Sequence, residues 1–130
     1  MKNFLIIVIC LFVFSPCYSR WKKIFEVDNF IEYFEMNSVK KINDTIYIWS
    51  MRDYKKSLKN GILSKKYFIQ FDCIKKRYQV LSIIGYKTKM GKGRNFEYIK
   101  NVNNPKNQID WIYPSFNSED EVRLNAVCND

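Results

Sequence analysis

The stretch that decides the fold is residues 45–54, TIYIWSMRDY. β-branched and aromatic residues alternate along it with a period of two, which predicts a strand with one buried face. On this pattern Tyr47, Trp49 and Met51 share one face of the strand. A lone strand cannot bury its apolar face, so we expect neighbouring segments of the sequence to pair with it.

Two further strands are predicted downstream of this one. Residues 64–74 (SKKYFIQFDCI) and 77–86 (RYQVLSIIGY) repeat the alternation, and the short link at residues 75–76 predicts a hairpin between them. Gly85 is expected to mark a bulge, which is typical of a glycine inside a strand pattern. One side of the first strand is expected to carry Tyr67, Ile69, Phe71 and Cys73, and the other side Gln70 and Asp72.

The segments before and between these strands have weaker patterns. Residues 21–27 predict a short strand, whereas residues 30–36 (FIEYFEM) fit a helical stripe and a strand equally well. Residues 37–44 are polar and are expected to form a turn. Residues 55–63 form a basic link, whose Asn-Gly pair predicts a tight turn.

The chain becomes basic and irregular after the third strand. Residues 87–94 (KTKMGKGR) carry four positive charges and two glycines, which is typical of an exposed, mobile loop. Residues 95–104 predict a weak strand, and residues 105–108 predict a turn. Residues 109–113 predict a last short extended segment before a proline.

A helix is predicted to begin after Ser118. Ser118 and Glu121 match the S-x-x-E capping box, and acidic residues in the first turn suit the positive end of the helix dipole. The apolar side of the helix is expected to contain Val122, Leu124, Ala126 and Val127. The sequence therefore predicts an α+β fold, in which a largely antiparallel sheet of five or six strands is packed by a C-terminal helix.

The first 19 residues have the three parts of a secretory signal peptide. Lys2 supplies the positive start, and residues 4–14 form an apolar run without a charge. Small residues occupy the two specificity positions of a cut before Arg20, namely Cys17 and Ser19. We therefore expect export, with residues 1–19 removed and residues 20–130 left as one mature domain.

Two other roles for this N-terminal segment were weighed against a cleaved signal. The apolar run is too short to span roughly 30 Å of hydrocarbon as a helix, which argues against an uncleaved membrane anchor. Lipidation at Cys17 is the second alternative, but Pro16 stands where a lipobox needs a small residue. We accordingly expect no stable membrane span after cleavage.

Two cysteines, Cys73 and Cys128, remain in the mature domain. An even pair in an oxidising compartment favours a disulfide between them, which would fasten the helix to the sheet and stabilise the fold by roughly 4 kcal/mol. Two free buried thiols are the alternative. The chain has no histidine, and two cysteines cannot complete a tetrahedral zinc shell. We expect no metal and no other cofactor.

The net charge of +9 at pH 7 favours a polyanionic partner, such as an acidic protein, an anionic (sulfated) glycan, nucleic acid or lipopolysaccharide. A merely solubilising role is the alternative, because the lysines are scattered rather than grouped in blocks. The densest basic segment supplies the candidate ligand contacts Lys87, Lys89, Lys92 and Arg94. The basic link supplies a second group, Lys55, Lys56 and Lys59.

The chemistry of common enzymes is largely missing from this chain. The absence of histidine removes the usual general base at neutral pH and the triads built on it, and no phosphate-cradling glycine motif occurs. Paired carboxylates could still hydrolyse glycosides, but their spacing selects no pair. The candidates are Glu26, Asp28, Glu32, Glu35, Asp53, Asp72, Glu97 and Asp110. We therefore expect a binding module rather than an enzyme.

Nucleic-acid binding is a further alternative that the sequence raises. Lysines and aromatic residues interleave at residues 65–68, as in proteins that stack bases on aromatic side chains. A strand whose aromatic residues face the core and whose lysines face water explains the same pattern, and export reduces contact with nucleic acid. We expect no nucleic-acid partner.

Short motifs along the whole mature domain occur in an order that resembles the bacterial surface-adhesin protein E family. Aromatic strand residues and two cysteines recur at matching places in this order. The motifs are Trp21, Tyr33-Phe34, Asn37-Ser38-Val39, Ile46-Tyr47-Ile48-Trp49, Asp53-Tyr54, Asp72-Cys73, Arg77, Tyr86, Trp111-Ile112-Tyr113-Pro114-Ser115 and Val127-Cys128.

The resemblance implies an antiparallel sheet covered by a C-terminal helix and tied to it by the Cys73–Cys128 disulfide. It also implies a location in the bacterial envelope, a homodimer, and binding of host matrix proteins such as vitronectin and laminin, which the family's namesake binds. The namesake is a lipoprotein, whereas this chain lacks a good lipobox, so we expect a periplasmic, surface or secreted protein. A periplasmic accessory protein without a host ligand is the alternative function.

Overall fold

The computed structural model describes residues 21–94, 96–101 and 110–129. The predicted signal peptide and the turn expected at residues 105–108 lie outside the described residues. The elements, in chain order, are β1 (Trp21–Glu26), β2 (Phe30–Glu35), the 3-10 turn η1 (Met36–Ser38), β3 (Lys40–Ile42), β4 (Thr45–Tyr54), β5 (Ser64–Asp72), β6 (Arg77–Tyr86), the 3-10 turn η2 (Lys89–Gly91), β7 (Phe96–Asn101) and α2 (Glu119–Cys128). These elements confirm the predicted α+β class, with a sheet of seven strands.

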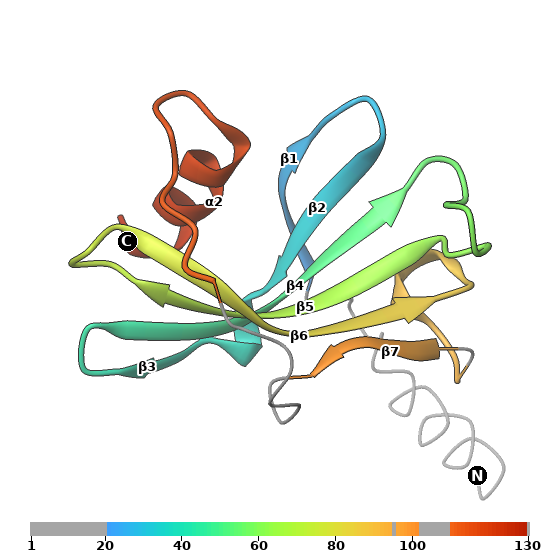
Figure 1. Ribbon diagram of the computed structural model, residues 1–130, viewed down its shortest axis with the longest axis horizontal. Coiled ribbons are helices and arrows are strands. Elements are labelled where there is room, and N and C mark those ends of the chain that lie inside the picture. The colour runs from blue at the N-terminus through green and yellow to red at the C-terminus, as the bar shows by residue number, and fades with distance from the viewer. Residues whose placement is uncertain (1–20, 95, 102–109, 130) are drawn as a thin grey trace, which may run out of the picture.

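The sheet is antiparallel and is built outward from β4 (Figure 1). The strand order is β1-β2-β4-β5-β6-β7, and β3 also pairs with β4. β2 and β3 share one edge of this long strand, because Phe34 pairs with Ser50 and Lys40 pairs with Tyr47. The stretch with the strongest strand pattern is therefore the one that contacts the most other strands.

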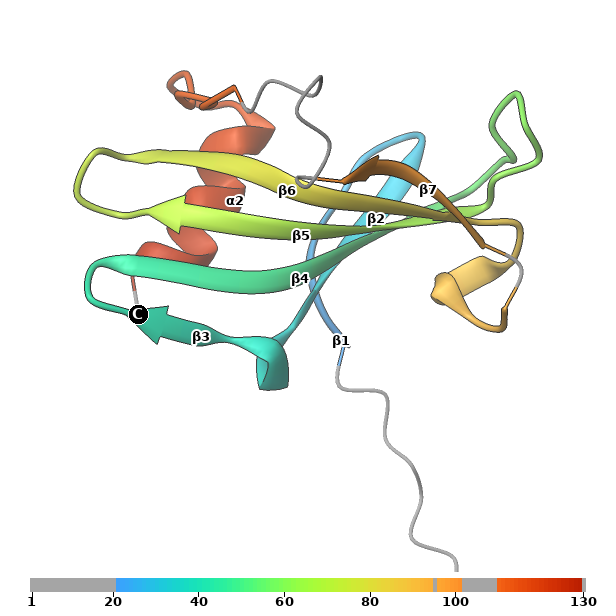
Figure 2. The same cartoon turned by 60° about the horizontal axis from the view of Figure 1, so that its bottom comes forward.

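The predicted faces of the strands are confirmed. Ile46 and Ile48 of β4 are buried with Ile69 and Phe71 of β5 in the core cluster beneath α2. The alternate residues of β4, which include Tyr47 and Trp49, lie on the opposite side of the sheet, as the period of two requires. We call the side that α2 covers the helix face and the opposite side the open face; Figure 2 shows the open face in front of α2.

Residues 30–44 form more strand than the sequence indicates. Residues 30–36, which fitted a helix and a strand equally well, form β2, and the expected turn at 37–44 contains the short strand β3. All three residues of β3 are exposed, so it has no apolar alternation from which to predict it. The tight turn to β4 has Asn43 in the left-handed region, with φ 56°, which asparagine adopts more readily than most residues.

Gly85 lies beside the predicted bulge and also makes a close contact with the 55–63 link. A register shift does lie beside it, between Ile83 and Ile84. A Cβ atom on Gly85 would, however, stand only 2.7 Å from Cδ1 of Ile62. The glycine therefore lets the 55–63 link pack directly on the sheet.

The C-terminal helix begins as predicted but presents a different side to the sheet. Ser118 Oγ accepts a hydrogen bond from Glu121 N at 3.1 Å, which confirms the N-cap. The Glu121 carboxylate accepts from Asn117 N, one residue before the position that a full capping box would use. Val122 is 45% exposed, so its expected place on the apolar side is wrong, whereas Arg123 and Leu124 are buried.

The disulfide joins Cys73, just after β5, to Cys128 at the end of α2. The two residues are 55 positions apart in the sequence, and their Cα atoms are 5.5 Å apart. The predicted pairing is confirmed, and the alternative of two free thiols is wrong. The bond holds the helix over one end of the sheet, which we call the disulfide end (Figure 1).

Candidate ligand-binding surface

The two basic segments that the sequence singles out meet at the end of the sheet away from the disulfide. The link 55–63 joins the end of β4 to the start of β5, and residues 87–94 follow the end of β6. Because β5 and β6 are antiparallel and Ser64 pairs with Tyr86, both connections leave the sheet at the same end (Figure 1). We call this the basic end.

Residues 87–94 are largely exposed, as the sequence predicts, and they contain a 3-10 turn that is hydrogen-bonded to β4 and β5. Ser64 Oγ accepts a hydrogen bond from Gly91 N at 2.8 Å and donates one to Thr88 O at 2.6 Å. Met90 N donates to Asp53 Oδ1 at 2.8 Å. Gly91 is buried in the left-handed region, with φ 58°, which glycine adopts without strain, and a Cβ atom there would displace the Lys66 side chain.

The four candidate contacts of this turn are not equivalent. Lys87, Lys92 and Arg94 are exposed, and no ion pair to them occurs among the described residues. The Lys89 ammonium instead donates a hydrogen bond to the backbone carbonyl of Tyr54. The structure therefore leaves three cations of the predicted set directed to solvent and uses the fourth to fasten the turn.

The lysines of the link line two hollows on either side of it. Lys55 and Lys56 border a hollow of about 640 Å³, together with Asp28, Phe30 and Tyr54. The Lys55 ammonium lies 3.0 Å from Glu26 Oε1. The hydrogen bond from Lys55 and that from Lys23 hold the pKa of Glu26 below its usual value, so this carboxylate offsets part of the local positive charge.

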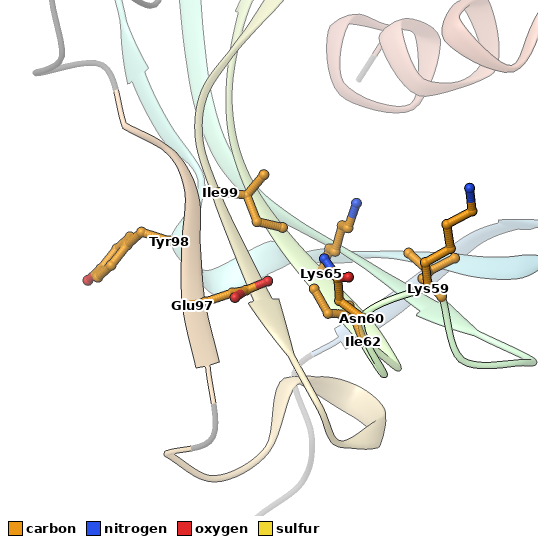
Figure 3. A pocket seen from close by; sticks show the side chains of 8 residues that line it. Lys59, Asn60, Ile62, Lys65, Glu97, Tyr98 and Ile99 are labelled. Atoms are coloured by element: carbon orange, nitrogen blue, oxygen red, sulfur yellow. The ribbon is translucent and has the colours of Figure 1, made fainter.

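Lys59 borders the second hollow, which has a volume of about 500 Å³. Ile62 and Ile99 form its apolar lining, and Lys65 and Glu97 add one charge of each sign (Figure 3). Each side of the link thus presents lysine ammonium groups above an apolar floor. Such a surface can contact an extended anionic partner, but it holds no arrangement of groups for catalysis.

The sequence analysis missed a polar network that is buried between α2 and the sheet. The carboxylate of Glu32 on β2 accepts hydrogen bonds from Arg123 Nε at 2.7 Å and Nη2 at 3.0 Å, and from Arg52 Nε at 3.0 Å. Arg123 Nη1 also donates to the Tyr78 hydroxyl at 2.9 Å and to Asp120 Oδ1 at 2.6 Å.

Burial and charge act in opposite directions on the pKa of Arg123. Burial is the largest single influence and lowers this pKa, but Glu32, Tyr78 and Asp120 together raise the pKa above its usual value. Arg123 therefore keeps its charge in the interior, and its hydrogen bonds to Glu32 dock the helix on the sheet. A signal for it exists in the sequence: the strand pattern of β2 places Glu32 on the same side as Phe34, and a buried carboxylate needs a cation.

Metal binding and glycoside hydrolysis find no support in the part of the chain that the structure describes. No group of three or more histidine, cysteine, aspartate or glutamate side chains is placed to hold a metal ion there. Five hollows formed by described residues each contain at most one carboxylate in their lining, so they lack the pair that glycoside hydrolysis needs. Within residues 21–94, 96–101 and 110–129, no helix is long and apolar enough to cross a membrane.

Comparison with known proteins also points to a binding protein. The sequence profile of the surface-adhesin protein E family matches residues 21–129, so the chain belongs to that family. Membership supports a surface adhesin that is exported, and it favours a binding protein over an enzyme. A search of curated proteins finds no significant match.

Solved structures of protein E from Haemophilus influenzae share the fold. One of them, a second crystal form, superposes with a TM-score of 0.68 at 11% sequence identity, covering 88% of this chain and 91% of that chain. Protein E from non-typeable Haemophilus influenzae gives a TM-score of 0.66 at 12% identity, covering 88% of this chain and 79% of that chain. At this identity the likeness concerns the fold alone.

Proposed function

We propose that this protein is an adhesin-like binding module of the bacterial envelope, which contacts a host matrix protein or an anionic glycan through its basic end. The observation that carries the proposal is the meeting of two basic segments, 55–63 and 87–94, at one end of the sheet. The contact residues are Lys87, Lys92 and Arg94, with Lys56 and Lys59 beside them. Lys89 and Lys55 support this surface through their internal contacts.

Electrostatics makes this end suited to capture of an anionic partner. Exposed cations that are not neutralised by a neighbouring carboxylate raise the local positive potential. This potential speeds the encounter with a polyanion. Asp53 and Ser64 accept hydrogen bonds from Met90 N and Gly91 N and so hold the turn in one shape, and less conformational entropy is lost when a partner binds. A defined turn carrying three exposed cations is therefore a better contact site than a mobile loop of the same charge.

The location that we propose is outside the cytoplasm. The predicted signal peptide of residues 1–19 supports it, and so does the Cys73–Cys128 disulfide, since such bonds persist in oxidising compartments. The adhesin role requires that the domain reach the cell surface or the medium. The alternative role, a periplasmic accessory protein whose charge is only solubilising, predicts that it does not.

The experiment compares two variants that each lose three positive charges. The first carries Lys87→Gln, Lys92→Gln and Arg94→Gln at the basic end. The matched control carries Lys41→Gln, Lys75→Gln and Lys76→Gln, three exposed lysines at the disulfide end, since Lys41 pairs with Ile46 beside Phe71 and the other two closely follow Cys73. Both are tested by surface plasmon resonance against immobilised vitronectin, laminin and heparin over a series of salt concentrations.

We expect the basic-end variant to bind at least about tenfold more weakly at low salt and to show a flatter salt dependence than the wild type. The control variant should stay within about twofold of the wild type, because its charges lie away from the contact. Equal loss in both variants would show that only net charge matters, and unchanged binding of the basic-end variant would refute the proposed surface.

Location is tested separately on intact cells. Protease treatment of whole cells should degrade the protein if it is exposed, whereas osmotic shock should release it intact if it is periplasmic. Complete protection in whole cells would contradict the adhesin role and support the accessory one.

A further inference from the structure

Three aromatic side chains form a platform on the open face of the sheet, near its centre. Tyr47 and Trp49 come from β4, and Phe68 comes from β5. The ring centroids of Trp49 and Phe68 are 5.1 Å apart, and those of Tyr47 and Phe68 are 6.0 Å apart with their planes inclined by only 26°. All three side chains are half-buried, so each ring keeps a surface in contact with solvent.

A row of polar side chains runs across the strands beside this platform. In the strand register Lys40 pairs with Tyr47, Tyr47 with Gln70, and Gln70 with Gln79. The Gln79 amide donates a hydrogen bond to Gln70 Oε1, and Gln70 Nε2 donates to the Tyr47 hydroxyl at 3.2 Å. The row therefore orients a phenol and two amides in fixed directions along the edge of an aromatic surface.

The platform and the start of this row line one shallow groove of about 360 Å³. Its other walls are Ser38, Lys40 and Ile42, from η1 and β3. Lys40 is the only charged residue in this lining, which contains no carboxylate. Because Lys40 is exposed and stands directly across from Tyr47, a cation lies at one end of an uncharged aromatic groove.

We propose that this groove binds an anionic saccharide, specifically an oligosaccharide that contains a uronic acid. A pyranose ring has an apolar face of C–H groups and a polar edge of hydroxyl groups. The apolar face can stack on the solvent-facing side of a half-buried platform ring, and the hydroxyl edge can exchange hydrogen bonds with the Tyr47 phenol in the groove and with the half-buried Gln70 amide next to it. The ammonium of Lys40 complements the carboxylate of the uronic acid.

A second copy of the chain fits the groove less well than a sugar does. A symmetric contact would bring the same surface to itself. The groove lining of a second copy would offer Lys40 no carboxylate, and the contact would cover the Lys40 ammonium without a charged partner. The charge of the groove therefore favours an anionic ligand that carries its own hydroxyl groups.

This site is separate from the basic end and does not rest on the function proposed for that end. The platform lies on the open face of β4 and β5, whereas the basic end is formed by the connections that follow β4 and β6. Loss of charge at residues 87, 92 and 94 should leave binding in the groove unchanged. The failure of one proposal can thus be told from the failure of the other.

Nuclear magnetic resonance can test the groove without an engineered probe. The chain has three tryptophans, whose indole N–H signals report on three different places. The probe is a hexasaccharide of alternating glucuronic acid and N-acetylglucosamine, and the neutral control is the N-acetylglucosamine hexamer. We expect the acidic hexasaccharide to shift the Trp49 signal in a saturable manner, while the signals of Trp21 and Trp111 stay in place.

Variants separate stacking from charge. Phe68→Ala should weaken binding of the acidic hexasaccharide up to about tenfold through loss of stacking. Lys40→Gln should remove most of the preference for the acidic over the neutral hexasaccharide, and it keeps the fold because Lys40 is exposed. Tyr98→Ala, which removes an aromatic ring 65% exposed on the edge strand β7, is the matched control and should change neither result.

Several outcomes would overturn the proposal. The proposal is wrong if the Trp49 signal does not respond to the acidic hexasaccharide. It is also wrong if all three tryptophan signals shift together, as in non-specific binding. It is likewise wrong if the neutral hexamer binds the wild type as tightly as the acidic hexasaccharide does. It is wrong, too, if the Trp49 signal moves with protein concentration alone, in which case the occupant is a second copy of the chain. If Phe68→Ala fails to fold, the Lys40→Gln comparison decides the question.

Discussion

Glu32 and Arg123, which are 91 positions apart in the sequence, form a two-point ion pair in the interior of the protein. Each residue is 1% exposed, and the contacts are Nε to Oε2 at 2.7 Å and Nη2 to Oε1 at 3.0 Å. The planar guanidinium matches the carboxylate at both oxygens, which lysine could not do. The pair fixes the position of α2 on the sheet at a point away from the disulfide.

Removal of Arg123 should destabilise the fold strongly. Arg123→Ala leaves the Glu32 carboxylate buried with only Arg52 as a partner, and breaking a buried pair from one side costs about 3–5 kcal/mol. Arg123→Lys should recover little of this, because one ammonium cannot bond both oxygens. Urea unfolding measures the effect, and a loss below about 1 kcal/mol for Arg123→Ala would show that the pair does not hold the helix.

The disulfide should stabilise the domain without shaping the basic end. Replacing Cys73 and Cys128 with serine should lower the free energy of unfolding by roughly 4 kcal/mol, since the bond closes a long loop of the unfolded chain. The turn at residues 87–94 is fastened by Asp53 and Ser64 at the other end of the sheet. Under conditions where the variant is folded, heparin binding should therefore equal that of the wild type, and its loss would reveal coupling between the two ends.

Two buried serines should respond in opposite ways to the loss of their hydroxyl groups. Ser50 and Ser64 are both 0% exposed, but Ser50 Oγ has no hydrogen-bond partner among the described residues, whereas Ser64 Oγ bonds Gly91 and Thr88. Ser50→Ala should leave stability unchanged or raise it by up to about 1 kcal/mol, and Ser64→Ala should lower it by about 1–3 kcal/mol. Thermal unfolding of both variants compares them, and equal losses would contradict the assigned contacts.

High pH should weaken the fold through buried tyrosines. Burial raises the pKa of Tyr67 and of Tyr78 above the value of about 10 for free tyrosine. Above pH about 10 the unfolded chain therefore releases protons that the folded chain retains, so stability is complete below this pH and falls as the pH rises further. Urea unfolding between neutral and strongly alkaline pH measures the decline.

Ultraviolet absorbance gives an independent check of the same titration. Exposed tyrosines should ionise at a pH of about 10 to 11, whereas the buried tyrosines Tyr67 and Tyr78 should not. The tyrosinate absorbance of these two should appear only when the protein unfolds. Tyr67→Phe should reduce the alkaline decline in stability, whereas Tyr98→Phe, which changes a mostly exposed ring, should not. A decline of the same size in both variants would contradict the role of the buried phenol.

The sequence is most informative where one physical rule acts alone. In β4 the period of two needs only the geometry of a strand, and burial alternates along Thr45–Ser50 as this period requires. The serine cap of α2 is likewise local, because the hydroxyl bonds a backbone N–H three residues ahead. Predictions failed where burial depends on a residue far away in the sequence. Val122 is apolar yet exposed, and its neighbour Arg123 is charged yet buried, because Arg123 pairs with Glu32.

The sequence by itself predicted the faces of β4 and β5, the β5–β6 hairpin, the serine cap of the helix and the two basic segments, and it favoured the pairing of the two mature cysteines. These features depend on period, on local hydrogen bonds or on counting, and none needs knowledge of distant contacts. Only the tertiary structure decided that both basic segments meet at one end of the sheet, that Glu32 finds Arg123, and that Lys40 borders the aromatic platform. Each of these is a juxtaposition across strands, which strand register and helix docking create and which no local pattern encodes.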